Sequence, residues 1–338
     1  MHDLRFYHRP EDVTLGELAE RSGGQLRGDA TLTVTTVGAF SDAENGAMCF
    51  FEGKAEGAAK ISPAATVCVL NEASAEHLPR GVNAIIVERP RSVFSTLATE
   101  LLRHRGVEDD WPELGAAKIA DSAKIARGAL ICDGAEIGND SVIGPNVVIG
   151  PGVKIGAECR IGAGCVIETA LIGNDVQIKP NTVIGGTGFG VIHERSGQKL
   201  APHFGRVVIQ DHVSIGANCC IDRGVFGDTV IGEHTRLDNL IQVAHNVQIG
   251  RNCTMAAFSG MAGSVRVEDW VQMGGRVGAA DHLVIGEGAL LAANSALMRD
   301  VPPGETWGGT PAKPLRQMLR EMSWLSKNAA IRPKKKSD

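Results

Sequence analysis

The sequence predicts a mainly β protein: a parallel β-helix of hexapeptide repeats, preceded by a small α/β domain and followed by an α-helix. Aliphatic residues recur at every sixth position through the middle of the chain. The composition includes 42 glycines but only 4% aromatic residues, which suits thin, regular layers better than one thick core. The residues before 113 and after 307 lack the six-residue period, so we expect them to form separate units.

Residues 1–112 predict the α/β domain. Segment 14–23 suits a short helix with Thr14 as its N-cap, and segment 91–105 suits a longer helix. Three further segments, rich in β-branched and other apolar residues, suit strands: 31–37, 65–70 and 84–89. The stretch 107–115 then separates this domain from the repeats.

The repeat region spans 113–307. Isoleucine occupies nine positions six residues apart, from Ile119 to Ile167, and a last unbroken series of hexads runs from Ile231 to Leu297. This period fits neither a helix nor a long strand. It fits short strands joined by tight corners, with one aliphatic side chain inward per hexad. Three hexads make one triangular coil, and stacked coils pair as parallel strands about 4.8 Å apart.

Two insertions interrupt the hexads. The longer, near 186–207, predicts an external loop, and the shorter lies at 223–229. Loops that project from a rigid scaffold often hold binding residues. The glycines at 186, 188 and 190 lack the strand-to-helix context and spacing of a dinucleotide-binding loop, so that function is rejected.

The C-terminal unit, 308–338, predicts an amphipathic helix and a basic tail. The helix is indicated by apolar residues at helical spacing: Leu315, Met318, Leu319, Met322 and Leu325. Basic residues outnumber acidic ones from Lys313 onward, although the whole chain carries a net charge of −5. Charge alone favours a solvated tail, and a docking surface for an acidic partner is the alternative.

The bulk composition excludes several classes. A net charge of −5 argues against a nucleic-acid-binding protein. The first residues lack the pattern of a secretion signal, and no apolar run is long enough to span a bilayer, so we expect a cytoplasmic protein that does not cross the membrane. The eight cysteines form no CxxC pair, so reduced, packed thiols are expected and no metal site.

His245 and Gly263 are the candidate catalytic pair. His245 lies two residues after Val243, and Gly263 occupies the same slot one coil later, after Met261. A histidine beside a glycine N–H suits acyl transfer, because the imidazole accepts a proton while the N–H stabilises a tetrahedral oxyanion. A structural histidine, hydrogen-bonded at a corner, fits the same spacing.

The chain also resembles a known family over nearly its whole length, the UDP-3-O-(3-hydroxyacyl)glucosamine N-acyltransferases of lipid A biosynthesis. These enzymes belong to the hexapeptide-repeat acyltransferase superfamily. The resemblance is carried by GFG at 188–190, CIDRG at 220–224, LDNLIQVAHNVQIG at 237–250, MAGS at 261–264 and GGRVGAADHLVIG at 274–286. It implies a left-handed β-helix, a homotrimer and a Gram-negative source.

The resemblance further implies a reaction. A 3-hydroxyacyl chain moves from the phosphopantetheine of acyl carrier protein to the 2-amine of a UDP-glucosamine-type lipid precursor, without metal or tightly bound cofactor. His245 is implied as general base, Gly263 as the oxyanion N–H donor, and His282 as an aid at the thioester. An acidic carrier partner also favours the basic tail as a docking surface.

The same resemblance implies further site residues. Three of them orient the base and the sugar: Asp238, Gln242 and Asn246. Phe50 is implied to stack on uracil, which makes 1–112 a uridine-binding-type domain, and a core role for Phe50 is the alternative. Gly53 stands where the family has asparagine. Ala296 and Met298 lie where the family closes its acyl groove.

Two other functions fit a hexapeptide coil. One is the related O-acyltransferase that acts on UDP-N-acetylglucosamine, which the size of the N-terminal domain disfavours. The other is a γ-carbonic-anhydrase-like zinc enzyme, which needs histidines that converge from adjacent coils. His245 and His282 are separated by a coil that carries glycine in the matching slot. A purely structural solenoid would need none of the motifs above.

Overall fold

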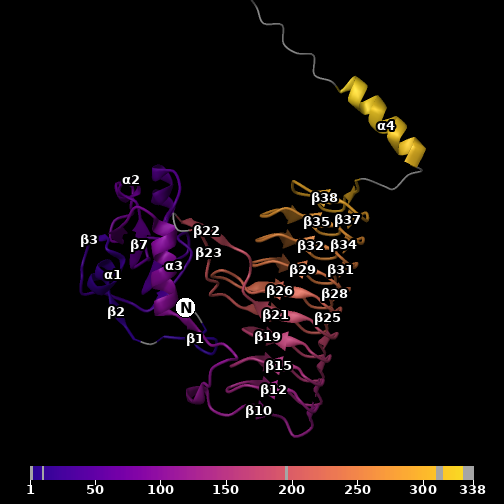
Figure 1. The fold of residues 1–338 in the computed structure, drawn as a ribbon, viewed down its shortest axis with the longest axis horizontal. Helices are drawn as coiled ribbons and strands as arrows, with labels where there is room; N and C mark the ends of the chain where they lie inside the picture. Colours follow the sequence, from indigo (N-terminus) through magenta and orange to yellow (C-terminus); the bar gives the residue numbers. More distant parts are fainter. Residues whose placement is uncertain (1–2, 10, 195–196, 310–314, 330–338) are drawn as a thin grey trace, which may run out of the picture.

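The computed structural model describes residues 3–9, 11–194, 197–309 and 315–329. Figure 1 shows a long solenoid of stacked coils with a small α/β unit at its side, level with the middle and later coils. A hairpin of β22 (Val191–Glu194) and β23 (Gly197–Leu200) reaches from the solenoid toward that unit, and helix α4 (Leu315–Asn328) follows the last coil. A mainly β protein built on a parallel coil with a C-terminal helix is therefore confirmed.

A five-stranded sheet, in the order β3-β8-β7-β6-β5, forms the N-terminal unit. Strands β5 to β8 pair in parallel, and β3 joins β8 antiparallel. Helix α3 packs on β6 and β7, and 3₁₀ helix η1 packs with α2. The elements are β1 (Tyr7–His8), β2 (Val13–Thr14), α1 (Leu15–Ser22), β3 (Gln25–Arg27), β4 (Thr33–Val34), β5 (Thr36–Val37), β6 (Ala47–Phe50), η1 (Ala55–Lys60), β7 (Val67–Leu70), α2 (Glu72–Ala75), β8 (Asn83–Ile86), α3 (Pro90–Leu101), β9 (Arg103–His104) and η2 (Pro112–Leu114).

Helix α1 begins as its sequence predicts. The Thr14 hydroxyl accepts a hydrogen bond from the Glu17 backbone N–H, and the Glu17 carboxylate accepts one from the Thr14 N–H. This capping box satisfies two N–H groups that the first turn leaves free. Gly23 ends the helix in the left-handed region, at a φ of 63°, which glycine adopts without steric cost. Strand β6, which includes Cys49 and Phe50, was not predicted.

The solenoid consists of three parallel sheets, and each coil contributes one strand to each sheet in turn. In the described residues the sheets contain nine, ten and nine strands. Each inward aliphatic residue pairs with its counterpart one coil away, for example Ile143 with Ile161 and Ile149 with Ile167. These side chains are buried, whereas Ile119 on the first coil is 42% exposed because no earlier coil covers it.

The strands of the solenoid follow the hexads. The first sheet contains β10 (Lys118–Ile119), β13 (Glu136–Ile137), β16 (Lys154–Ile155), β19 (Ala170–Ile172), β24 (Val207–Ile209), β27 (Thr229–Ile231), β30 (Gln248–Ile249), β33 (Arg266–Val267) and β36 (Val284–Ile285). The second contains β11 (Lys124–Ile125), β14 (Val142–Ile143), β17 (Arg160–Ile161), β20 (Gln177–Ile178), β25 (Ser214–Ile215), β28 (Arg236–Leu237), β31 (Thr254–Met255), β34 (Gln272–Met273), β37 (Leu290–Leu291) and β39 (Thr306–Trp307). The third contains β12 (Leu130–Ile131), β15 (Val148–Ile149), β18 (Val166–Ile167), β21 (Val183–Gly186), β26 (Cys220–Asp222), β29 (Gln242–Val243), β32 (Gly260–Met261), β35 (Gly278–Ala279) and β38 (Ala296–Leu297).

Small residues at the corners allow the coils to stack closely. A Cβ atom on Gly138 would lie 2.5 Å from the carbonyl carbon of Gly156. A Cβ atom on Gly156 would likewise lie 2.5 Å from the carbonyl oxygen of Gly173. The second position after the small corner residue is often in the left-handed region, as at Asn146, Asn246 and Asn252. Asparagine tolerates this backbone better than most residues.

The longer insertion forms hairpin β22 (Val191–Glu194) and β23 (Gly197–Leu200), outside the coil. Helix α3 holds it through two hydrogen bonds. The Ser92 hydroxyl donates to the Glu194 carboxylate at 2.6 Å, and the Lys199 ammonium donates to the Thr96 hydroxyl at 3.0 Å. The hairpin thus connects the solenoid to the N-terminal unit.

Helix α4 (Leu315–Asn328) follows the last coil. Four of its apolar side chains are more than half exposed: Leu319, Met322, Trp324 and Leu325. The expected basic tail at 330–338 and Lys313 lie outside the described residues. None of the helices in the described ranges has the length and apolar character needed to cross a bilayer.

Candidate active site

Strands β29 and β32 bring His245 and Gly263 together. Val243 pairs with Met261, so the corners that follow these strands are stacked. A Cβ atom on Gly263 would lie 2.4 Å from Cε1 and 2.7 Å from Nε2 of His245. The imidazole therefore lies over the glycine, in space that only a residue without a side chain leaves open. The Gly263 N–H makes no hydrogen bond within the described part of the chain.

Asn246 orients the His245 ring. Its side-chain oxygen lies 3.2 Å from Nδ1 of His245 and also accepts the Val225 backbone N–H at 2.9 Å. An amide oxygen only accepts, so Nδ1 carries the proton of the neutral ring and Nε2 has the free lone pair. The Asn246 N–H donates to the Thr229 hydroxyl at 2.8 Å, which fixes the corner. The nitrogen nearest to Gly263 is thus an acceptor.

A second histidine, His203, packs edge-to-face against His245. The ring centroids are 5.1 Å apart and the planes meet at 63°. Gly188, from the loop before hairpin β22–β23, lies against both rings, since a Cβ there would be 3.0 Å from Nε2 of His203 and 3.1 Å from Cβ of His245. The sequence analysis did not identify His203, because the fold of the insertion is needed to bring it here.

Arg223 holds this loop in place from the buried interior. Its guanidinium donates to the carbonyl oxygens of His203 and Gly185, at 3.2 and 2.9 Å, and to the Thr187 hydroxyl at 2.9 Å. Only 5% of Arg223 is exposed. Several hydrogen bonds to a buried guanidinium make this anchor rigid.

The site opens into a cavity of about 120 Å³ between the two units. Its walls include His245 and His203 on the solenoid side, and Phe50, Phe94 and Arg91 from the N-terminal unit. The Phe50 ring packs on Phe94, with centroids 4.9 Å apart, and stays partly exposed. Phe50 and His245, 195 positions apart in sequence, thus share one cavity.

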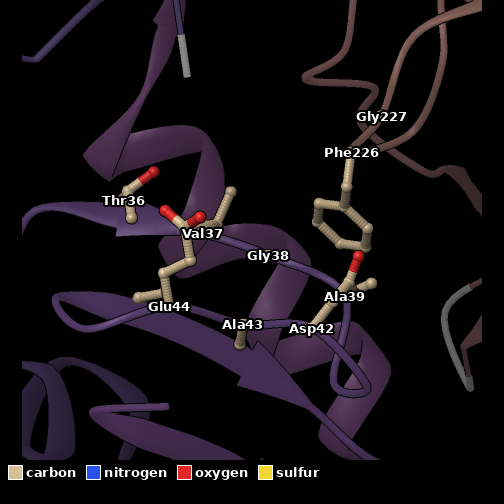
Figure 2. A pocket seen from close by; sticks show the side chains of 10 residues that line it. Thr36, Val37, Gly38, Ala39, Asp42, Ala43, Glu44, Phe226 and Gly227 are labelled. Carbon is tan, nitrogen blue, oxygen red and sulfur yellow. The ribbon is translucent and has the colours of Figure 1, made fainter. Parts of the chain in front are cut away.

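A second cavity, of about 190 Å³, lies on the other side of Phe226. Figure 2 shows the Phe226 ring directed toward the loop that carries Ala39 and Asp42. Asp42 and Glu44 line this cavity, and carboxylates disfavour a phosphate anion. Arg91 lines the first cavity and makes no ion pair among the described residues, so an anionic group fits better there.

Gln242 lies on β29, the strand that directly precedes His245, and its side chain binds Asp222 on β26. Its side-chain amide donates to the Asp222 carboxylate at 2.9 Å. Burial raises the pKa of Asp222 to about 6, although the bond from Gln242 and the charge of Arg223 oppose that rise. A carboxyl group that titrates near neutrality is typical of functional sites.

Asp238 is not brought to His245. It follows Leu237 on β28, at a different corner of the coil, and its carboxylate accepts the Asn239 backbone N–H at 2.8 Å. His282 lies one coil beyond Gly263, with its N–H on the Gly263 carbonyl oxygen at 3.0 Å, and its side chain is exposed. Within one chain the geometry thus places Asn246, at 3.2 Å, beside the His245 ring, and Asp238 at another corner of the coil.

The two expected acyl-groove residues lie near the end of the coil. Ala296 is the outward residue of β38 and pairs with Gly278 of β35. Met298 is 80% exposed. Gly260, Gly278 and Ala296 pair in succession along the third sheet. These three outward positions carry only small residues and thus form an open strip on the coils beyond His245, here called the small-residue strip.

A separate group of possible metal ligands lies at another corner. The rings of His212 and His234 stack 4.7 Å apart, near the coil spacing, and Glu233 completes a set of ligand atoms within 4.8 Å of one another. Asp175 binds Nδ1 of His212 at 3.0 Å. These residues follow strands of the first sheet, whereas His245 follows the third, so the group does not belong to the His245 site.

Comparisons agree with this architecture. The family model described as "Bacterial transferase hexapeptide (six repeats)" matches residues 116–151, 134–169 and 228–263. The stacked hexapeptide coils are those of a hexapeptide-repeat transferase. A UDP-3-O-acylglucosamine N-acyltransferase from Caulobacter sp. (strain K31) is 47% identical over 337 residues, which cover 98% of each chain. The chain belongs to the UDP-3-O-acylglucosamine N-acyltransferase family and is an acyltransferase.

Other relatives are similar over parts of the chain. An enzyme of the same name from Methylobacterium nodulans is 53% identical over 161 residues, 48% of this chain and 46% of its own. Among solved structures, a UDP-N-acetylglucosamine acyltransferase from Campylobacter jejuni is 25% identical, with a TM-score of 0.46 over 62% of this chain and 82% of that chain.

Proposed function

We propose that this protein transfers a 3-hydroxyacyl chain from acyl carrier protein to the 2-amine of UDP-3-O-(3-hydroxyacyl)glucosamine, a step of lipid A biosynthesis in the cytoplasm of a Gram-negative bacterium. The observation that carries the proposal is the position of the His245 imidazole over Gly263, with Nε2 as a free acceptor. The substrate class comes from the names of the relatives, which are UDP-3-O-acylglucosamine N-acyltransferases.

The steps follow from this geometry. The amine nitrogen attacks the thioester carbonyl carbon, and Nε2 of His245 takes a proton from the amine as the C–N bond forms. The oxygen becomes an oxyanion, which the Gly263 N–H stabilises. When the intermediate collapses, the C–S bond breaks and the imidazolium returns its proton to the phosphopantetheine sulfur. The products are an amide and a free thiol, and His245 is neutral again.

The remaining residues receive roles in this reaction. Phe50 stacks on uracil in the cavity, and Arg91 pairs with the diphosphate. Gln242 and Asn246 orient the sugar and the base, and His282 assists at the carrier arm. The acyl chain lies along the small-residue strip and ends near Ala296 and Met298. The carrier protein docks on the basic C-terminal unit, and the functional assembly is a homotrimer.

The test is acyl transfer to UDP-3-O-acylglucosamine, with wild type compared with His245→Ala and His245→Gln. We expect the wild type to form the amide product, and both variants to lose at least about 10²-fold in kcat, the range for loss of a general base. A wild type inactive with 3-hydroxyacyl carriers of all chain lengths would refute the proposed reaction. A fully active His245→Ala variant that keeps its fold would remove His245 from its role.

A further inference from the structure

The His203 side chain has a polar atom that the proposed reaction does not yet use. Only 2% of His203 is exposed, and its Nε2 has no hydrogen-bond partner among the described residues. A buried acceptor without a hydrogen-bond partner destabilises the protein, because it has lost its bonds to water. Such a group therefore calls for a partner, and His203 lines the same cavity as Phe50 and His245.

The protonation of this ring follows from its neighbours. Nδ1 lies 3.0 Å from the Ala201 carbonyl oxygen, which can only accept, so Nδ1 carries the hydrogen and Nε2 the lone pair. Burial lowers the pKa of His203 to about 4, and the charge of Arg223 adds to that effect. His203 is thus a neutral acceptor at physiological pH and a weak base.

The backbone holds this acceptor in a fixed position. The His203 carbonyl oxygen accepts from Arg223 Nε at 3.2 Å and from the Tyr7 hydroxyl at 3.3 Å. Gly188 and the His245 ring both pack against the His203 ring. A rigid acceptor beside the general base is suited to hold a substrate donor in one orientation.

We propose that His203 is a substrate-positioning residue whose Nε2 accepts a hydrogen bond from an N–H or O–H donor on the amino sugar of the acceptor substrate. The inference rests on the proposed function and gives the two histidines different roles. His245 moves the proton, and His203 holds the sugar so that the amine faces His245. The donor is the second amine N–H or a hydroxyl next to it, because the two rings are only 5.1 Å apart.

Two variants separate this role from packing. His203→Phe keeps an aromatic ring and removes the acceptor, whereas His203→Gln restores an acceptor oxygen. We expect His203→Phe to bind UDP-3-O-acylglucosamine about 10-fold more weakly in calorimetry without acyl donor, the effect of about 1.4 kcal/mol. Its KM for the acceptor should rise by a similar factor, its KM for the acyl carrier should stay unchanged, and His203→Gln should recover most of the affinity.

Several outcomes would overturn the inference. Equal affinity of wild type and His203→Phe, or a glutamine variant as weak as the phenylalanine variant, contradicts the hydrogen bond. An equal rise in KM for both substrates indicates a general packing defect instead. If His203→Phe does not fold, as judged by its melting curve, His203→Leu replaces it. A wild type that fails to bind the UDP-sugar refutes the proposed function itself, which separates that failure from the failure of His203.

Discussion

The imidazole of His245 occupies the space where a side chain on Gly263 would be. A Cβ atom on Gly263 would lie 2.7 Å from Nε2 of His245. The two residues belong to consecutive coils, and the ladder fixes their separation through the hydrogen bond from the Ser264 N–H to the His245 carbonyl oxygen at 2.9 Å. The proposed proton acceptor and the proposed oxyanion donor are therefore held by the same backbone repeat.

Gly263→Ala should displace the His245 ring. A methyl group there cannot fit within 2.4 Å of Cε1, so the imidazole must rotate away from the reacting amine. We expect kcat to fall by about 10²-fold, the usual effect of a misplacement of about 1 Å. Gly275→Ala is the matched control, because its Cβ meets only the Ala257 oxygen, at 3.4 Å, and should remain active. Similar rates for both variants would contradict the steric argument.

Asn246→Ala should release the His245 ring from its tautomer. The loss of the acceptor at Nδ1 allows the proton to move to Nε2, and we expect kcat to fall by at least about 10²-fold. Asn246→Asp keeps an acceptor oxygen and should retain more activity. Asn252→Ala, at another corner with φ of 57°, controls for the cost of removing asparagine from this backbone conformation. Steady-state kinetics decides, and an active Asn246→Ala enzyme would exclude the orienting role.

Acid should destabilise the protein in part through His104. Burial lowers the pKa of His104 to about 3, and Arg223 repels the charged form. Since the unfolded ring titrates near 6.5, the unfolded state binds more protons between that pH and the folded pKa. The stability that the protein gains by keeping His104 neutral is thus complete well above pH 6.5, and it decreases as the pH falls toward 3. Between pH 7 and pH 5 the loss should be about 2 kcal/mol.

The measurement is denaturant unfolding at both pH values, with His104→Gln as the comparison. Glutamine does not titrate and can still bond the Thr169 hydroxyl, which His104 Nε2 contacts at 2.8 Å. We expect the variant to lose less stability than wild type between pH 7 and pH 5. Equal losses would show that His104 is not a source of the acid sensitivity.

Ala296→Phe should shorten the acyl chain that the enzyme prefers. Ala296 faces outward on β38, beyond the glycines of β32 and β35, so a phenyl ring there would block the open strip. Competition between 3-hydroxyacyl carriers of different lengths measures the effect, and selection should move toward shorter chains by about 10-fold or more. An unchanged preference for acyl-chain length would show that the acyl chain does not pass Ala296. The same substitution to phenylalanine at the exposed Met298 tests whether the acyl chain reaches that residue.

The hexads predicted the coil well because each one fixes the same local geometry. From Ile119 to Leu297 every predicted inward position lies on a strand, and the stacking of His245 on Gly263 followed from counting eighteen residues. The same count places Asp238 and His245 at different corners, since Leu237 and Val243 are one hexad apart and so lie on different faces. His203 could not be found this way, because its position depends on a hairpin outside the repeat.

The coil continues in register across that hairpin. Ile172 pairs with Ile209 and Ile184 with Ile221, as if the intervening residues were absent. An insertion at such a corner adds side chains above a reactive residue without disturbing the rungs beneath it. Exchange of the 186–207 segment between related enzymes would therefore change the side chains around His245 and leave the coil beneath them intact.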